Sequence, residues 1–270
     1  MKLKSAINTA CILIAGIGFL SCSSVPLTGR SQLHLIPDSE IMSMSYQQYR
    51  DFLKENKLST DAQKTAMVKN VGVRIQKAVE AFFKEKGLSD ELKGYAWEFN
   101  LVESNQLNAW CMPGGKVVFY TGILPTCKDE TGIAVVMGHE VAHAVAEHGA
   151  ERMSHALVAE LGGVALSVAV KNEPEETQAL WMGAYGLGAQ YGAMLPFSRS
   201  HESEADHLGL IFMAMAGYDP NAAVGFWQRM AAGGGQKPPE FMSTHPSDET
   251  RIADIRKHLP EAMTYYKKQP

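Results

Sequence analysis

The sequence is poor in cysteine and carries no excess of positive charge. Only 4 of its 270 residues are cysteine, which excludes a small scaffold held together by many disulfide bonds. Its 25 basic and 29 acidic residues give a formal net charge of -4. Proteins that bind nucleic acid usually present a basic surface, so we expect no nucleic-acid partner.

The sequence also lacks a long uninterrupted hydrophobic run. Residues 156–171 are almost wholly apolar, but Glu160, Gly162 and Gly163 interrupt them. A helix that spans a bilayer needs about 20 apolar residues. We therefore interpret this stretch as a helix that is buried or covered by a partner.

The first 21 residues have the pattern of a secretion signal. Two lysines precede an apolar run over residues 10–20, and Ser21 stands immediately before Cys22. The pattern resembles a bacterial lipobox, so we predict that residues 1–21 are removed and that Cys22 carries a lipid anchor. The alternative is a simple cleaved signal with an incidental cysteine.

The residues after Cys22 bear on cellular location. Residues 22–36 are largely polar and include Pro26 and Gly29, which favours a short tether before the folded body. Ser23 stands where an aspartate can retain lipoproteins at the inner membrane. We therefore expect a lipid-anchored protein of the bacterial cell envelope, at the periplasmic face of the outer membrane.

Cysteine usage leaves one possible disulfide in the body of the protein. Cys11 would leave with the signal and Cys22 would be acylated, so Cys111 and Cys127 remain. The sequence is compatible with a bridge and with two separate thiols, because it does not give the distance between the two residues.

Hydrophobic periodicity predicts helices in the first part of the body. Residues 39–57 and 60–86 both have a helical pattern. In the second segment six apolar residues form one core-facing stripe: Val68, Val71, Ile75, Val79, Phe82 and Phe83.

The pattern then changes to that of strands and back again. Residues 97–101 alternate, and residues 116–120 are rich in valine and aromatics, which indicates two or three strands of a small sheet. Helical periodicity over residues 132–155 without a proline predicts one helix there. The expected fold is mainly α-helical α+β, with residues 37–265 as a single domain.

His139-Glu140-Val141-Ala142-His143 carries the strongest chemical signal. Residues four apart lie on one face of a helix, about 6 Å apart along its axis, so both histidine rings can reach one metal ion. Glu140 lies beside them and is placed to act as a general base on a water molecule. Catalytic zinc takes three protein ligands and one water, so we predict one zinc ion per chain.

The third zinc ligand has to come from elsewhere in the chain. Glu147 and Glu151 lie too far along the predicted helix to reach the ion. The acidic cluster at residues 198–206 offers Glu202 and Asp206, which are four apart and share one face of a helix. We assign Glu202 to the metal and Asp206 to a hydrogen bond with a ligand histidine.

Together these motifs resemble the gluzincin family that contains HtpX, BepA, Oma-like proteins and the CAAX prenyl endopeptidase, and they are most similar to its soluble members. The resemblance covers most of the chain after Cys22. It rests on the His-Glu-x-x-His pattern, on Ser-Arg-x-x-Glu-x-Glu-Ala-Asp at residues 198–206, and on His245-Pro246 followed by Arg251. It extends through Asn108-Ala109-Trp110, Pro113-Gly114-Gly115 and Pro26-Leu27-Thr28-Gly29-Arg30.

The resemblance implies a zincin-type domain with a small sheet edging the cleft, and it assigns roles to further residues. His245 and Arg251 would face the reacting carbonyl and stabilise its developing negative charge. Alternatively, His245 would occupy the fourth zinc position in a latched resting state. The strand that contains Asn108, Ala109 and Trp110 would bind an extended peptide along its edge.

These features predict a zinc-dependent endopeptidase that acts on unfolded or misassembled envelope proteins. Its expected partners are extended polypeptides and, through Cys22, a membrane. One alternative is a latched, chaperone-like zinc lipoprotein with little turnover. Another is a purely structural envelope protein, which would bind no stoichiometric zinc.

Overall fold

The chain divides into two compact units. The large unit comprises residues 39–147 and 201–270, and the small unit comprises residues 1–38 and 148–200. The sequence predicted one uninterrupted domain over residues 37–265, whereas residues 148–200 belong to the small unit. The computed structural model describes residues 22–171, 175–187, 195–232 and 249–267.

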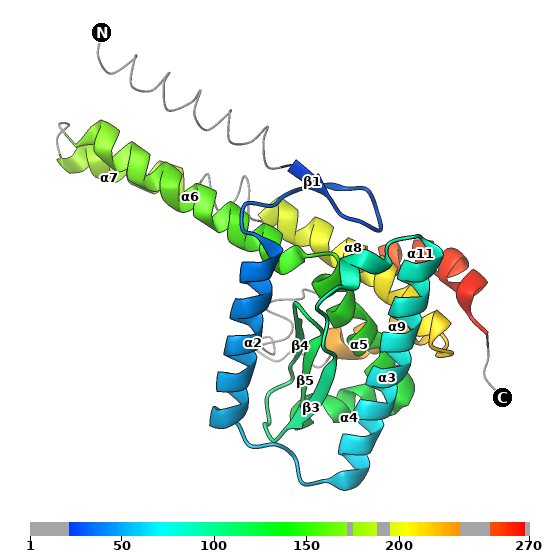
Figure 1. Cartoon of the computed structure of the whole chain (residues 1–270). Helices are drawn as coiled ribbons and strands as arrows, with labels where there is room; N and C mark the ends of the chain where they lie inside the picture. The colour runs from blue at the N-terminus through cyan, green and yellow to red at the C-terminus, as the bar shows by residue number, and fades with distance from the viewer. Residues whose placement is uncertain (1–21, 172–174, 188–194, 233–248, 268–270) are drawn as a thin grey trace. The chain divides into compact units, whose positions relative to one another are not determined.

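The large unit contains a three-stranded mixed sheet in the order β3-β5-β4 (Figure 1). β3 (Glu98–Val102) runs parallel to the central strand β5 (Lys116–Tyr120), and β4 (Ala109–Met112) pairs with β5 in the antiparallel direction. The turn between β4 and β5 passes through Gly114 and Gly115, whose φ angles of 87° and 77° favour glycine. The predicted α+β fold with a small sheet is confirmed.

Two helices precede the sheet, close to their predicted positions. α2 spans Asp38–Glu55 and α3 spans Ala62–Glu85. α3 begins where the Asp61 side chain accepts a hydrogen bond from the Lys64 backbone N–H at 3.0 Å. The predicted apolar stripe of α3 is buried throughout, and the helix packs against β3 and α5 (Glu130–Val145).

The remaining elements of the large unit are helical. α5 is buried along almost its entire length and packs against α3, α4, β4 and α9, so it is the central helix of this unit. α8 (Leu195–Met215) contributes its residues from His201 onward. The others are η1 (Ser89–Leu92), η2 (Thr121–Ile123), α4 (Leu124–Cys127), α9 (Ala222–Ala232) and α11 (Glu249–Tyr265).

The single helix predicted over residues 132–155 is wrong in one respect. α5 ends at Val145, and Glu147 has a left-handed φ of 59°, so that His148 begins a separate helix. A residue other than glycine rarely adopts this conformation, and neither Ala146 nor Glu147 is of a type that marks a helix end. The His-Glu-x-x-His pattern remains whole on α5.

The small unit joins a two-stranded hairpin to two helices. β1 (Cys22–Ser24) pairs in the antiparallel direction with β2 (Ser31–Leu33). α6 (His148–Val170) packs against β2 and against α7 (Glu175–Leu187).

The predicted tether over residues 22–36 is folded within this unit. The Arg30 guanidinium pairs with both carboxylate oxygens of the buried Glu151, at 3.0 and 2.7 Å. The Leu35 backbone N–H donates to the Ser154 hydroxyl at 3.0 Å. These contacts fix the β1–β2 hairpin to α6.

The sequence predicted that residues 156–171 form a buried or covered helix, and burial is wrong. Leu161, Val164 and Val168 of α6 are 57%, 56% and 58% exposed. Among the described residues, α6 is the one helix whose length and apolar composition would allow it to cross a membrane.

Candidate active site

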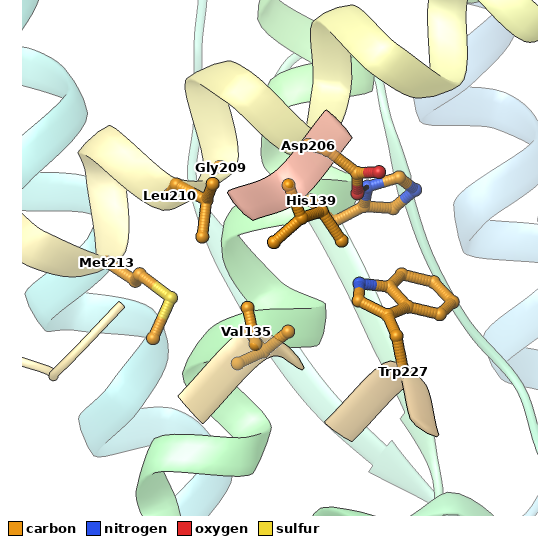
Figure 2. Close-up of a pocket in the computed structure, with 9 residues that line it drawn as sticks. Val135, His139, Asp206, Gly209, Leu210, Met213 and Trp227 are labelled. Atoms are coloured by element: carbon orange, nitrogen blue, oxygen red, sulfur yellow. Dashed lines mark ion pairs between the residues drawn. The ribbon is translucent and has the colours of Figure 1, made fainter. Parts of the chain in front are cut away.

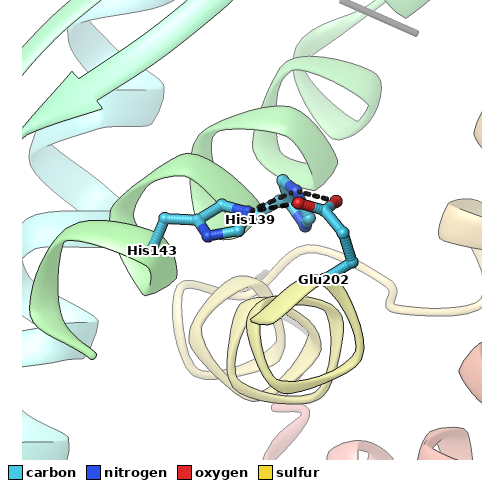
Figure 3. Close-up of side chains that lie close together, drawn as sticks. All are labelled: His139, His143 and Glu202. Atoms are coloured by element: carbon cyan, nitrogen blue, oxygen red, sulfur yellow. Dashed lines mark hydrogen bonds and ion pairs between the residues drawn. The ribbon is translucent and has the colours of Figure 1, made fainter. Parts of the chain in front are cut away.

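Three side chains from two helices converge on one point in the large unit (Figure 3). His139 and His143 lie one turn apart on α5, and Glu202 lies on α8. The two Nε2 atoms are 3.1 Å apart, and carboxylate oxygens of Glu202 lie 3.3 Å from His139 Nε2 and 3.2 Å from His143 Nε2. All three residues are buried. The fold therefore brings together the three residues that the sequence proposed as metal ligands.

The spacing of these donor atoms suits a tetrahedral zinc ion. Zn–N and Zn–O bonds of about 2.0–2.1 Å at tetrahedral angles place neighbouring ligand atoms about 3.3 Å apart. The two Nε2 atoms, 3.1 Å apart, are close to this value. Each histidine faces a different oxygen of the Glu202 carboxylate, Oε2 at 3.3 Å from His139 and Oε1 at 3.2 Å from His143, so this carboxylate can bind an ion held between the two rings. Two imidazoles and one carboxylate are a donor set of catalytic zinc, and they leave a fourth position for water.

Asp206, one turn after Glu202 on α8, orients the first histidine. One Asp206 oxygen lies 2.9 Å from His139 Nδ1, so the ring donates its Nδ1 proton there and keeps Nε2 toward Glu202. Arg251 on α11 donates to both Asp206 oxygens at 2.7 Å, and its Nη1 lies 3.2 Å from Glu202. A bidentate pair of this kind fixes the orientation of a carboxylate. Asp206 thus couples α11 to the three ligand residues.

Burial and charge act against each other at this cluster. Burial lowers the pKa of His139, but its contacts with Asp206 and Glu202 outweigh burial and raise the pKa to about 9. Burial raises the pKa of Asp206, but Arg251 and His139 outweigh it and hold this pKa below its ordinary value. Without a metal, His139 is therefore protonated at neutral pH, and a metal ion has to displace that proton.

Glycines set the distance between the two ligand-bearing helices. A Cβ at Gly209 on α8 would lie 2.9 Å from the His139 backbone nitrogen. A Cβ at Gly138 on α5 would lie 2.7 Å from the Gly209 carbonyl oxygen. Real Cβ atoms essentially never approach other atoms this closely, so the two backbones can cross here only because both residues are glycine. The crossing brings Glu202 within reach of His139.

A pocket lined mainly by apolar side chains lies beside His139 and Asp206 (Figure 2). Trp227 on α9 lies against His139, with ring centroids 5.6 Å apart, and the Arg251 guanidinium stacks 3.5 Å from the centre of the Trp227 ring. Apolar surroundings strengthen the ion pair between Arg251 and Asp206. The other walls include Val135, Leu210, Met213 and Ile255.

Glu140 follows His139 on α5 and is buried. α5 packs against β4, and Cys111 on that strand is close enough to Glu140 for its charge to act on the thiol. Burial first, and then the Glu140 carboxylate, raise the pKa of Cys111 well above its ordinary value. The glutamate that the sequence proposed as a base therefore lies beside the sheet.

β4 presents an open backbone edge on the side away from β5. The Tyr120 N–H donates to the Asn108 carbonyl at 3.1 Å, so alternate residues from Asn108 onward bond to β5. The backbone groups of Ala109 and Cys111 therefore point away from β5. In the part of the chain that the structure describes, no strand pairs with this edge. The Trp110 side chain packs in an aromatic cluster next to α2.

Other predicted residues have different outcomes. His245 lies outside the described residues. The Arg251 guanidinium engages Asp206 and Glu202, and its predicted contact with the reacting carbonyl stays a prediction. Lipidation of Cys22 stays a prediction.

The sequence left the pairing of two cysteines in this region open, and it did not single out three other residues. Cys111 and Cys127, which the sequence left as thiols or a bridge, are separate thiols. Sequence reasoning missed Trp227, Gly138 and Gly209. The glycines lie beside the ligand motifs, but a spacing rule for side-chain ligands does not report where two backbones touch.

A mainly helical fold with a small mixed sheet, and a buried His-His-Glu cluster with a second glutamate beside it, define a metallopeptidase of the His-Glu-x-x-His class. Comparison with known proteins agrees. Residues 71–259 match peptidase family M48, so the chain belongs to this family. The chain is a metalloendopeptidase, and the resemblance inferred from the motifs is confirmed.

The relatives include mitochondrial and bacterial peptidases. The chain is 34% identical over 258 residues to mitochondrial metalloendopeptidase OMA1 of Schizosaccharomyces pombe, which covers 93% of this chain and 71% of that protein. It is 30% identical over 271 residues to metalloendopeptidase OMA1, mitochondrial, of Homo sapiens, covering 97% of this chain and 50% of the relative. It is 31% identical over 169 residues to the beta-barrel assembly-enhancing protease of Escherichia coli, covering 59% and 34%.

These relatives correct the expected location. We predicted a location in the bacterial cell envelope, at the periplasmic face of the outer membrane, and this location is wrong. The lipid on Cys22 is a separate prediction that these relatives do not test. The relatives that match over 93% and 97% of this chain are named as mitochondrial enzymes. The secretion-signal pattern on which the prediction rested lies in residues 1–21, outside the described residues.

Proposed function

We propose that the chain is a zinc-dependent endopeptidase that cleaves extended segments of unfolded or misassembled polypeptides, with one zinc ion per chain. The observation that carries the proposal is the buried triangle of His139, His143 and Glu202, with Glu140 next to it. The two imidazoles and the carboxylate are the donor types of a catalytic zinc site, and they face one another at separations of 3.1–3.3 Å. A purely structural role does not require two histidines and a glutamate to converge in this way with a second glutamate beside them.

The residues of the chain divide the chemical work among them. A zinc ion held by this triangle would lower the pKa of a coordinated water molecule and polarise the scissile carbonyl. Glu140 accepts the proton of the attacking water and passes it to the leaving amine nitrogen as the C–N bond breaks. Asp206 holds His139 in one tautomer. Arg251 acts through Asp206 and Glu202, so we assign it a positioning role.

We propose that the substrate binds by adding a strand to the open edge of β4, where Ala109 and Cys111 present backbone groups. This mode of binding uses backbone hydrogen bonds, so it favours unfolded segments of varied sequence. The Ala109 N–H donates to the Asn108 side chain at 2.9 Å, a contact that a substrate carbonyl would replace. The chain covers about half of the length of the human relative, and the activity proposed here is that of this chain alone.

Replacing Ala109 with proline tests the strand edge. Ala109→Pro removes an N–H that points away from β5, so it leaves the hydrogen bonds between β4 and β5 in place. We expect peptide binding to weaken about fivefold, the contribution of roughly one hydrogen bond. Ala109→Ser keeps the N–H and is the control. Unchanged peptide affinity of a folded Ala109→Pro protein would show that substrate does not use this edge.

We also propose that Cys22 carries a lipid that attaches the chain to a membrane. The support is the sequence pattern before Cys22. Intact-mass measurement of the purified mature chain tests it: we expect an N-terminal Cys22 with acyl mass added, and an unmodified chain would refute the anchor.

Cleavage of casein by the purified chain, with zinc measured on the same sample, tests the central proposal. Glu140→Gln should retain one zinc per chain and lose turnover by about 10²–10⁴-fold, the range for loss of a general base. Glu91→Gln, an exposed glutamate on η1, is the matched control and should cleave normally. Wild-type turnover by Glu140→Gln would refute the role of Glu140. Zinc without cleavage by wild type would favour the latched alternative, and His245→Ala should then release activity.

A further inference from the structure

The exposed hydrophobic residues of this chain are concentrated on two helices of the small unit. Ten large hydrophobic side chains are exposed among the described residues, and seven of them belong to α6 and α7. Such a concentration usually marks a surface that binds another apolar phase. The seven are Leu157, Leu161, Val164, Val168, Leu180, Trp181 and Met182.

The contacts that hold the two helices together leave these side chains outside. The Tyr185 hydroxyl of α7 donates to the Ala159 carbonyl of α6 at 2.8 Å. A Cβ at Gly162 would lie 2.2 Å from that hydroxyl, so the tyrosine can pack here only because residue 162 has no side chain. The exposed residues of α6 recur at intervals of four, three and four, which puts them in one stripe along the helix.

We propose that the α6–α7 hairpin, residues 148–187, lies in the plane of a lipid surface and buries its apolar side chains among the acyl chains. A fluid lipid layer suits α7 better than a second protein does. Residues 179–184 are all exposed, and six consecutive residues cover every side of a helix. Lipid can cover all of these sides, whereas a protein partner covers one.

The positions of charged residues favour a hairpin that lies in the interface over one that spans the bilayer. Glu160 lies at the edge of the α6 stripe, and Lys171 and Glu175 are exposed at the facing ends of the two helices. Between Glu160 and Lys171 the uncharged part of α6 is ten residues, or about 15 Å, half of the roughly 30 Å hydrocarbon core. A helix in the interface keeps such charges at the level of the headgroups.

The charge of the hairpin also indicates which lipid it fits. Apart from histidines, α6 has one basic residue, Arg152, and α7 has none. The two helices therefore have no basic face for anionic headgroups. Trp181 is 54% exposed, and tryptophan favours the boundary between acyl chains and headgroups. We therefore expect binding to zwitterionic phosphatidylcholine, driven by apolar burial and little affected by salt.

The hairpin is also continuous with the predicted lipid attachment site. Cys22 begins β1, which pairs with β2, and β2 packs against α6. The ion pair between Arg30 and Glu151 fixes this connection. A lipid on Cys22 and the apolar hairpin therefore belong to one compact unit, although the hairpin would bind lipid without the anchor.

A fluorescent amino acid with a dansyl side chain, placed at one position of the full chain, tests the proposal. Position 164 reports on the hairpin, and position 73 is the control, because Val73 is also an exposed valine on a helix but belongs to the large unit. With phosphatidylcholine vesicles we expect a blue shift at 164 and none at 73. Any lipid on Cys22 holds both labelled proteins at the vesicle, so the difference reports the hairpin.

Nitroxide-labelled lipids then give the depth of the probe. Quenching at 164 should be stronger from a nitroxide near the glycerol end of the acyl chain than from one near its terminal methyl. The opposite order would indicate a spanning hairpin and overturn the in-plane proposal. A shift without vesicles that grows with protein concentration would mean that a second copy covers the face. No shift at 164 would overturn the proposal entirely.

A pair of substitutions gives an independent check. Leu161→Glu with Val168→Glu, both at exposed positions, should reduce hairpin contact without unfolding the chain. We expect the fraction of probe 164 in lipid, expressed as a partition ratio, to fall by about tenfold or more, because burial of each aliphatic side chain favours the lipid phase. Val73→Glu should leave the ratio unchanged, and an unchanged ratio in the double variant would contradict the proposal.

Discussion

Asp206 connects the metal-binding cluster to the last helix of the chain. Its carboxylate accepts from His139 on one side and from two nitrogens of Arg251 on the other. Such a partner fixes the tautomer and the orientation of a ligand histidine. Trp227 supports the arrangement from the opposite face, because it contacts both His139 and Arg251. The geometry of the site therefore depends on residues that would not touch the metal.

Arg251→Lys tests whether Arg251 positions the ligands. A lysine cannot reproduce the bidentate pair, so Asp206 and His139 lose their fixed orientation. We expect zinc affinity, measured by competition with a chelator, to fall by about 10–100-fold. Arg256→Lys, at an exposed position of α11, should change nothing. Normal zinc affinity with lost turnover would instead support the predicted contact of Arg251 with the reacting carbonyl.

The raised pKa of His139 makes zinc binding depend on pH. Its pKa is about 9 without metal, so below that pH each zinc ion displaces a proton. Apparent zinc affinity should rise about tenfold per pH unit from pH 7 and level off near pH 9. In the metal-free chain the sign is opposite: the stability that protonated His139 contributes is full below its ordinary pKa of 6.5 and is lost as pH rises through about 9. Titration calorimetry in buffers of different ionisation enthalpy measures the proton release, and affinity independent of pH above 7 would contradict it.

At the scale of elements, the crossing of α5 and α8 determines whether the ligands meet. Helical spacing placed His139 and His143 on one face and Glu202 and Asp206 on another, because each pair lies within one helix. It could not say that the two helices touch at Gly138 and Gly209, since that contact depends on tertiary packing.

Gly209→Ala tests the crossing. The added methyl would lie 2.9 Å from the His139 nitrogen, so α8 has to move away from α5. We expect the free energy of unfolding to fall by about 1–3 kcal/mol. Zinc affinity should also fall, because Glu202 moves away from the two histidines with α8. Gly225→Ala on α9 is the control, because its Cβ would meet only the Arg229 side chain at 3.5 Å. Equal stability and zinc affinity in the two variants would show that the close approach is not required.

The elements differ in how well the sequence predicted them, for physical reasons. α3 was predicted because its apolar residues repeat with the helical period and all face the core. The break after α5 was not predicted, because Glu147 adopts a left-handed conformation that is rare for glutamate and cannot be inferred from its residue type. α6 was expected to be buried, since an apolar composition does not distinguish a core helix from an exposed one.

At the scale of the whole molecule, the segment between the two ligand-bearing stretches belongs to a different unit. The ligand helix α5 and the ligand-bearing part of α8 lie in the large unit, while residues 148–200 contribute to the small one. Sequence patterns alone gave one domain, because no linker of distinct composition marks either boundary. The division implies that events at the metal centre need not reach α6 and α7.

Removal of zinc from the folded chain tests this division by hydrogen exchange. Zinc that binds only the folded large unit stabilises that unit, by about 4 kcal/mol when the free zinc concentration is a thousandfold above Kd. Removal of zinc by a chelator should therefore speed hydrogen exchange by up to about 10³-fold. We expect this effect in α5, α11 and the part of α8 after His201. Peptides from residues 156–170 should exchange at an unchanged rate, because α6 holds none of the ligands. His139→Ala, which lacks a ligand, should show no response to the chelator in either unit. Equal acceleration in both units would mean that they open together, and that the small unit depends on the metal centre for its stability.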